Sequence, residues 1–252
     1  MSDSVPDGAR RAAAHVIVAD LDAPHIEEED RHHLQTVLRL RPGELVSATD
    51  GQGAGRLCRY AAGGSLIPDG EIVRRLLGLP SITVGFAPVK GDRPEWTVQK
   101  LTEVGVNRIV ILRTDLGVVR WDAERATHHL TRLRVVARLA VMQSRRWWLP
   151  EVVGVETVRS LVGEPGVAMA EPGGDPPSLD CPSILVGPEG GWSEAELQSA
   201  RVQVDLGPGV LRTESAAVVA GVLLVALRAG TVRPAGTLAP AGTVDPAGTP
   251  CR

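Results

Sequence analysis

The hydrophobic pattern beyond residue 79 alternates between short apolar runs and longer amphipathic stretches. The apolar runs are rich in β-branched residues and predict buried strands at Ser81–Ala87, Arg108–Leu112, Gly166–Ala170 and Ser183–Val186. Amphipathic stretches between them predict helices. This alternation indicates an α/β fold in which parallel strands are joined by right-handed crossovers.

Three longer helices are expected in this part of the chain. The first runs from Pro94, which suits an initial turn, to Gly105, which suits a helix end. The second spans Asp122 to about Arg145, and its arginines are expected to face solvent. Its apolar stripe consists of Leu130, Leu133, Ala137, Ala140 and Val141. The third, Glu214–Arg228, is apolar almost all round, so a subunit interface is a natural way to cover it.

Residues 12 to about 75 have a different pattern, which predicts a small β-rich unit. Strands are expected at His15–Val18, Leu45–Thr49 and Arg56–Tyr60, with a hairpin turn at Asp50-Gly51. A helix is expected over Glu27–Leu38. We therefore predict two domains, residues 1–78 and 79–230.

Two glycine-rich loops each follow a predicted strand and precede a predicted helix. The first is Gly187–Gly191, after which Ser193 and Glu196 form a capping-box pattern that predicts a helix start. The second begins at Leu206 and leads to a helix near Thr213. Such loops at the C-terminal end of a sheet favour a ligand site, although a tight turn that binds nothing has the same local pattern.

The composition of the chain argues against a membrane protein, a secreted protein and a metal-binding protein. The 252-residue chain has no apolar run of about eighteen residues and no apolar signal core near Met1, so neither a membrane span nor a secretion signal is expected. Its three cysteines are scattered, and His32-His33 lacks a nearby third ligand. We expect a cytoplasmic protein without a metal. The repeated Pro-Ala-Gly-Thr of residues 231–252 predicts a disordered tail.

The net charge of −3 conceals a basic segment. Residues 79–150 carry 12 basic and 6 acidic side chains, whereas residues 151–230 carry 4 and 11. A basic band of this kind is typical of a phosphate-binding face, but it also fits a solvated helix surface. The adjacent Trp147-Trp148 fit either stacking on bases or core packing.

Leu185–Gly191 and Leu206–Glu214 resemble the corresponding loops of the knotted SPOUT methyltransferases. More narrowly, the chain resembles the ribosomal RNA small subunit methyltransferase E family, which methylates N3 of a uridine in 16S ribosomal RNA. Further matching pieces are Lys90–Lys100, Glu103–Val106 and Gln143–Arg145. Five pieces in the family's order make the likeness specific, and it covers about residue 12 to residue 230.

The resemblance implies a parallel sheet with a C-terminal trefoil knot, a small N-terminal PUA-like β-barrel domain that binds RNA, and a homodimer. It implies S-adenosylmethionine as methyl donor, with ribosomal RNA or the small ribosomal subunit as partner, and no metal. Mapped onto this chain, three loops would hold the donor. The implied cofactor-binding residues are Met169, Glu171, Gly187, Pro188, Glu189, Gly190, Gly191, Leu206, Gly207, Val210, Leu211 and Arg212.

Transfer to N3 of uridine requires loss of a weakly acidic proton as the methyl group arrives. Arg212 is our candidate for stabilising negative charge on the uracil oxygens, and Glu214 for accepting the proton. Glu214 would serve equally well as a cap of its own helix. The expected RNA-binding residues are His33, Arg39, Lys90, Arg93, Lys100, Gln143, Arg145 and Arg146.

The chain departs from the family pattern at one position, since Met142 stands where the family usually has Glu before the Gln-Ser pair. Two other functions remain open. One is a ribose 2′-O-methyltransferase, whose third motif normally contains Ser-Leu-Asn, in contrast to Leu211–Ser215 here. The other is an RNA-binding relative without catalysis.

Overall fold

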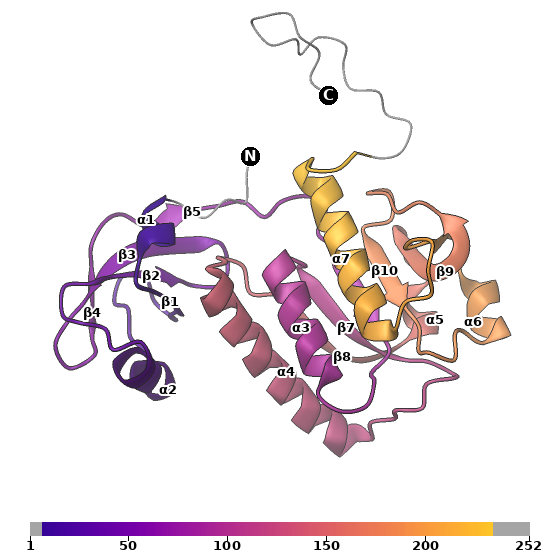
Figure 1. Ribbon diagram of the computed structural model, residues 1–252, viewed down its shortest axis with the longest axis horizontal. Helices are drawn as coiled ribbons and strands as arrows, with labels where there is room; N and C mark the ends of the chain where they lie inside the picture. Colours follow the sequence, from indigo (N-terminus) through magenta and orange to yellow (C-terminus); the bar gives the residue numbers. More distant parts are fainter. Residues whose placement is uncertain (1–6, 234–252) are drawn as a thin grey trace, which may run out of the picture.

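The computed structural model describes residues 7–233, apart from the side chains of Asp7, Glu29, His33 and Ala123. The chain forms two β-sheets, each with its own hydrophobic core, and these lie at opposite ends of an elongated molecule (Figure 1). Most of the predicted tail, residues 234–252, is outside the described part, so its disorder stays a prediction.

The N-terminal sheet has five strands in the order β1-β2-β3-β4, with β5 also paired to β3. The strands are β1 (Ala14–Ile17), β2 (Leu45–Thr49), β3 (Ala54–Tyr60), β4 (Leu66–Pro68) and β5 (Val73–Arg74). The predicted hairpin at Asp50-Gly51 is confirmed, because β2 and β3 pair antiparallel and Asp50 Oδ1 accepts from Gln52 N and Ala54 N. Within the turn, the Asp50 carboxylate thus takes the place of a backbone carbonyl as the hydrogen-bond acceptor.

Short helices pack beside this sheet. They are α1 (Asp7–Arg11), α2 (Glu28–His32) and the π-helical turn η1 (His33–Val37). The single helix expected over Glu27–Leu38 is therefore divided into two types of turn. The second turn ends at Val37, and Arg39, two residues further on, has a φ of 52°, a left-handed conformation that does not continue a helix.

The C-terminal sheet has six parallel strands in the order β11-β9-β10-β6-β7-β8. They are β6 (Thr83–Phe86), β7 (Arg108–Arg113), β8 (Glu151–Thr157), β9 (Val167–Asp175), β10 (Ser183–Val186) and β11 (Gln203–Val204). The parallel α/β architecture is thus confirmed. Both β8 and the central position of β10, between β9 and β6, were absent from the sequence prediction.

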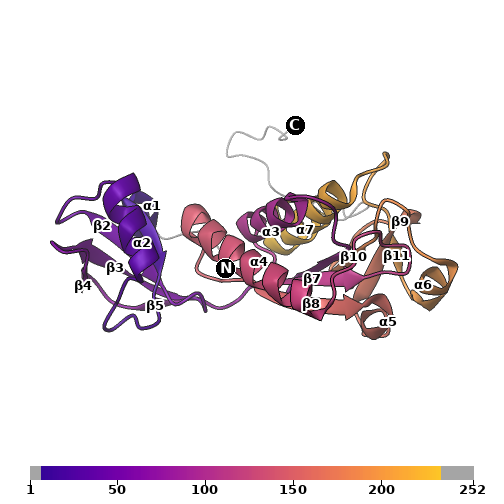
Figure 2. The ribbon, with the colours of Figure 1, turned by 90° about the horizontal axis from the view of Figure 1, so that it is seen from below.

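Helices cover both faces of this sheet (Figure 2). One face packs against α3 (Arg93–Val104), α4 (Ala123–Ser144) and α7 (Thr213–Ala229), and the other against α5 (Val158–Leu161) and α6 (Glu194–Ser199). The predicted helix ends are confirmed: Pro94 lies in the first turn of α3, Gly105 ends it in the left-handed region, and Asp122 caps α4 by accepting from Arg125 N.

The residues that follow α4 join the two domains. Gly53 N donates to Trp147 O at 2.9 Å, Leu149 N donates to Gly51 O at 2.8 Å, and His15 Nε2 lies 2.9 Å from Arg146 O. Trp147 is buried, which favours the packing interpretation of this aromatic pair over base stacking. A side chain at Gly53 would collide with the Trp148 ring, so the hairpin needs glycine there.

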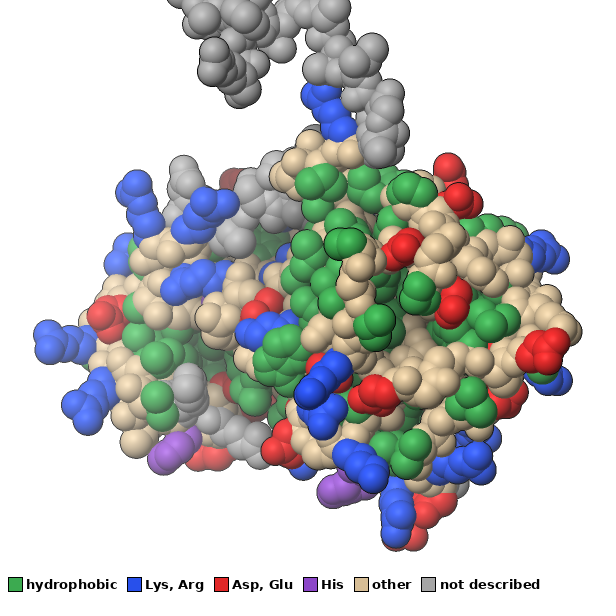
Figure 3. Space-filling model, turned by 45° about the vertical axis from the view of Figure 1, so that its right-hand side comes forward, with side chains coloured by type: hydrophobic (Ala, Val, Ile, Leu, Met, Phe, Trp, Pro, Cys, Tyr) green, Lys and Arg blue, Asp and Glu red, His purple; other side chains and the backbone are tan. Residues whose placement is uncertain are grey.

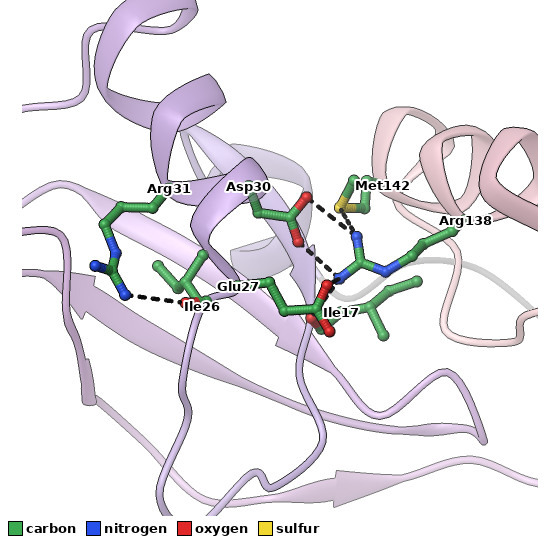
Figure 4. Close-up of polar contacts among 7 residues, drawn as sticks. All are labelled: Ile17, Ile26, Glu27, Asp30, Arg31, Arg138 and Met142. Atoms are coloured by element: carbon green, nitrogen blue, oxygen red, sulfur yellow. Dashed lines mark hydrogen bonds and ion pairs between the residues drawn. The ribbon is translucent and has the colours of Figure 1, made fainter.

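A second contact between the domains is made by α4 and α2 (Figure 4). Arg138 Nη2 lies 2.7 Å from Asp30 Oδ2 and 3.7 Å from Glu27 Oε2, and it also donates to Ile17 O at 3.3 Å. The expectation that Arg138 faces solvent is wrong, because the carboxylates of Asp30 in α2 and of Glu27 just before it hold the guanidinium in the junction. The described residues include no helix long and apolar enough to cross a membrane.

Candidate functional site

A cavity of about 390 Å³ lies at the C-terminal ends of β9 and β10, next to the start of α7. Its wall is formed by residues 170–172 of β9 and by the two loops that follow β10 and β11. Ten of the twelve predicted cofactor-binding residues line it: Glu171, Gly187, Pro188, Glu189, Gly190, Gly191, Leu206, Gly207, Val210 and Leu211. The other two lie elsewhere, since Met169 is fully buried in β9 and Arg212 is an exposed N-cap of α7.

The loop after β10 is a tight turn closed by a hydrogen bond from Gly191 N to Pro188 O at 2.9 Å. Gly191 has a φ of +72°, which a residue with a side chain rarely adopts. Trp192 follows at once and donates from Nε1 to Ala170 O at 2.9 Å, so the turn is tied to β9. The capping box of Ser193 and Glu196 then starts α6, as predicted.

The loop after β11 is held by Asp205. Its carboxylate accepts from Gly207 N and from Gly173 N, both at 2.9 Å, and so connects the loop after β11 with β9. These two backbone hydrogen bonds, first Gly207 and then Gly173, lower the pKa of Asp205. Thr213 Oγ1 donates to Gly187 O at 3.0 Å, which joins the start of α7 to the glycine turn.

The charge of the cavity lining favours a cationic ligand. Its lining residues include the carboxylates of Glu171, Glu189 and Asp205 and, among residues 7–233, no Lys, Arg or His. The rest is apolar side chain and bare backbone, which can recognise a flat heterocycle by its edges. A phosphorylated ligand is disfavoured because the lining offers no cation to a phosphate.

Glu214 lies in the first turn of α7 and contacts Arg93 of α3. Arg93 Nη1 is 3.4 Å from Glu214 Oε1 and 3.6 Å from Glu189 Oε1, so one guanidinium bridges the helix and the glycine turn. Glu214 Oε2 is buried and has no hydrogen-bond partner within the described residues. The helix N-cap is Arg212, and it makes no side-chain capping bond. Among the contacts of the described residues, Glu214 therefore pairs with Arg93 and makes no capping bond to its helix.

The predicted RNA-binding residues come from three separate regions. Arg39, Lys90 and Gln143 are exposed, whereas Lys100 is half-buried and bonds to Glu103 at 2.8 Å. The side chain of His33 lies outside the described part.

Arg145 and Arg146 bind the protein's own backbone. Arg145 Nη1 donates to Ala9 O at 2.6 Å, and Arg146 Nη1 donates to Val104 O at 3.4 Å. These two residues thus take part in the domain junction.

Sequence reasoning missed Trp192, Asp205 and Thr213 as parts of the cavity. Thr213 was named only as the approximate start of a helix, and nothing in the local sequence indicates its bond to Gly187, 26 positions away. No cluster of three potential metal-ligating side chains occurs in the described part of the chain.

Comparison with known proteins defines the class. The family described as an RNA methyltransferase domain matches residues 78–225, and the family described as an RNA methyltransferase PUA domain matches residues 26–65. Together with the parallel sheet and the loop-lined cavity, these matches place the chain among RNA methyltransferases that carry a PUA domain.

Comparison with individual proteins identifies the family within this class. The chain is 32% identical over 217 residues to ribosomal RNA small subunit methyltransferase E of Mycobacterium tuberculosis, covering 77% of this chain and 83% of the relative. It is 27% identical over 218 residues to the protein of the same name from Bacillus subtilis, covering 76% and 85%. The chain belongs to the ribosomal RNA small subunit methyltransferase E family.

Solved structures agree in fold. The ribosomal RNA small subunit methyltransferase E of Neisseria gonorrhoeae, bound to S-adenosyl methionine, has a TM-score of 0.71 and 26% identity, covering 85% of this chain and 97% of its own. A methyltransferase from Legionella pneumophila, in complex with the cofactor SAM, has a TM-score of 0.73 and 24% identity, covering 84% and 96%. At that identity the second likeness supports the fold alone.

Proposed function

We propose that this chain transfers the methyl group of S-adenosylmethionine to N3 of a uridine in small-subunit ribosomal RNA. The observation that carries this proposal is the cavity between β9 and the loops after β10 and β11, whose charged lining residues are all acidic within the described part, in a chain that belongs to this family. A substrate of this kind places the protein in the cytoplasm, where ribosomes are assembled.

The acidic lining of the cavity suits S-adenosylmethionine, whose sulfonium group is positively charged. The backbone of Gly187–Gly191 and Leu206–Leu211 would hold the adenine and ribose, and Glu171 or Glu189 would offset the sulfonium charge. A side chain at Gly187 would lie 3.0 Å from the Trp192 ring, so the narrow turn that forms this wall depends on glycine. When bound, the cofactor supplies an electrophilic methyl group.

Glu214 is placed to accept the proton from N3 of uridine. Arg93 contacts Oε1 of this carboxylate, and the buried Oε2 has no partner among the described residues, so Oε2 is the atom that would accept the proton once a base lies against the start of α7. In the reaction N3 would gain a bond to the methyl carbon as the bond from that carbon to sulfur breaks, the N3 proton would pass to Glu214, and S-adenosylhomocysteine would leave. Arg212 borders the cavity at the start of α7 and would stabilise negative charge on the uracil oxygens during that step.

We also propose that the protein works as a homodimer whose C-terminal domain is tied into a trefoil knot, with residues 1–78 as the RNA-binding domain. The exposed face of α7 supports the dimer, because Val222 is 43% exposed and Leu223 and Val218 are half-buried on an almost wholly apolar helix. Figure 3 shows hydrophobic side chains gathered over this helix. A second copy would remove that surface from water.

The test is a methylation assay on small ribosomal subunits and on naked 16S ribosomal RNA from cells that lack the endogenous enzyme. S-adenosylmethionine with an isotopically labelled methyl group is supplied, and the digested nucleosides are analysed by mass spectrometry. We expect label on the uracil base as N3-methyluridine. Label on ribose would instead identify a 2′-O-methyltransferase, and cofactor binding without transfer would identify a non-catalytic RNA-binding protein.

A further inference from the structure

A second cavity, of about 510 Å³, lies at the C-terminal ends of β7 and β8. Its wall includes Arg113, Thr114, Asp115, Arg120, Trp121 and Asp122, and we call it the arginine pocket. The carboxyl edge of a parallel sheet is the usual place for a ligand in an open α/β fold. None of these six residues was among the predicted site residues.

The arginine pocket and the loop-lined cavity lie on either side of one loop, residues 114–117. Asp115 N donates to Glu196 Oε1 at 3.0 Å, and Ser193 Oγ donates to Asp115 Oδ2 at 2.6 Å, so this loop is fixed to the start of α6. A side chain at Gly190 would meet Leu116 at 3.8 Å. The two cavities therefore adjoin, and a ligand that spans several nucleotides can enter both.

In the arginine pocket the two aspartates have partners within the protein, whereas the two arginines have no ion pair among the described residues. Asp122 caps α4 and contacts Arg125, and Asp115 accepts from Ser193, so both carboxylates are engaged by the protein. Arg113 and Arg120 are exposed and make no ion pair within residues 7–233. The positive charge in this pocket therefore remains available to a ligand.

Two further features suit a phosphate next to a nucleoside. The hydroxyl of Thr114 is buried without a hydrogen-bond partner among the described residues, and an entering acceptor oxygen would satisfy it. Trp121 is half-buried and stacks on His129, with ring centroids 4.3 Å apart, which holds the indole rigid in the pocket wall. A guanidinium binds phosphate through two parallel hydrogen bonds, so a pair of arginines makes a strong site.

We propose that the arginine pocket binds a backbone phosphate of the RNA substrate, beside the nucleotide that enters the loop-lined cavity. This inference rests on the proposed function, because it takes RNA as the substrate. It assigns the recognition of the flanking strand to Arg113 and Arg120, whose side chains, unlike those of Arg145 and Arg146, line this pocket.

The experiment compares the double variant Arg113→Gln/Arg120→Gln with the wild-type protein in binding to a 16S ribosomal RNA transcript at several salt concentrations. Loss of one or two phosphate contacts should weaken binding about tenfold at low salt and lower the slope of log affinity against log salt by roughly 1 to 2. Affinity for S-adenosylmethionine should stay unchanged, because both arginines lie outside the loop-lined cavity.

The matched control is Arg159→Gln/Arg201→Gln, which removes two exposed arginines of the same domain that line neither cavity. It should leave RNA affinity and salt slope near the wild-type values. Unchanged RNA binding in the first variant, or equal loss in the control, overturns the proposal. The measurement needs no methyl transfer, so an enzyme that methylates another atom would refute the proposed function while the phosphate site stands.

Discussion

Arg138 and Asp30 are 108 positions apart in the chain, yet Arg138 Nη2 and Asp30 Oδ2 lie 2.7 Å from each other. The Asp30 side chain is only 9% exposed, so the pair is shielded from solvent on the side of α2. It connects α4 of the methyltransferase domain with the N-terminal domain. We infer that this ion pair fixes the orientation of the two domains.

The pair should contribute measurably to stability. In a double-mutant cycle with Arg138→Met and Asp30→Asn, we expect a coupling free energy of about 1–2 kcal/mol from urea unfolding. The exposed pair Arg108 and Glu151, at 3.5 Å, is the control and should give less than about 0.5 kcal/mol. Equal coupling in the two pairs would show that the domain junction does not depend on this contact.

Met142 lies at the same junction between the two domains. Its Sδ lies 3.6 Å from Arg138 Nη1, and Asp30 and Glu27 already supply carboxylates to that guanidinium. A Glu at position 142, as is usual in the family, would place a third carboxylate next to this arginine. In this chain the arginine next to Met142 thus has its acidic partners from the other domain.

His15 should make the folded state sensitive to acid. Burial lowers its pKa to about 4, because the charged imidazole would lose its hydration beside the domain junction. Between about pH 4 and 6.5 the unfolded chain binds a proton that the folded chain does not, so stability rises with pH across this window. This residue alone should reduce the free energy of unfolding by about 2 kcal/mol between pH 7 and pH 5.

The measurement is urea unfolding of the wild-type protein and of His15→Gln at both pH values. The variant should lose much of the pH dependence, while His25→Gln, which replaces an exposed histidine, should retain it. An unchanged pH dependence in His15→Gln would show that this imidazole does not titrate abnormally.

Arg212→Ala should lower turnover far more than cofactor affinity. Arg212 is exposed at the start of α7 and does not line the cofactor cavity, so its proposed role is confined to the transition state. We expect the rate of methyl transfer under saturating substrates to fall about 10²–10³-fold. The calorimetric Kd for S-adenosylmethionine should change by less than about threefold. Comparable losses in both quantities would assign Arg212 to cofactor binding instead.

Val222→Asp should disrupt the proposed dimer, because it places a charge on the exposed apolar face of α7. Sedimentation equilibrium should show a dimer for the wild-type protein and a monomer for the variant. Val135→Asp is the matched control, since Val135 is 50% exposed on α4 and Val222 is 43% exposed on α7. A wild-type monomer, or a variant that stays dimeric, would exclude this face as the interface.

Local patterns were sufficient to predict many elements. Ser193 and Glu196 identified the start of α6, and Pro94 and Gly105 identified both ends of α3. These features act within one turn of helix, so the residues that determine them are neighbours in the sequence. The ten predicted residues that line the loop-lined cavity came from the family resemblance, which rests on contiguous sequence motifs, and their role in cofactor binding stays a prediction.

Contacts between residues that are far apart in the sequence could not be predicted from such local patterns. The position of β10 between β9 and β6 depends on packing of the whole sheet, and periodicity does not specify which strands are neighbours. Arg138 was predicted to face solvent because its own helix gives no indication of Asp30. The assignment of Arg145 and Arg146 to RNA stays a prediction, but the carbonyls that their side chains bind belong to distant segments and could not be foreseen.

The central claim is that the loop-lined cavity holds the methyl donor. A crystal structure of the protein with S-adenosylmethionine tests it directly. We expect the cofactor among Glu171, Gly187–Gly191 and Leu206–Leu211, with its methyl group facing Arg212 and Glu214. A cofactor bound at any other place on the chain would contradict the account.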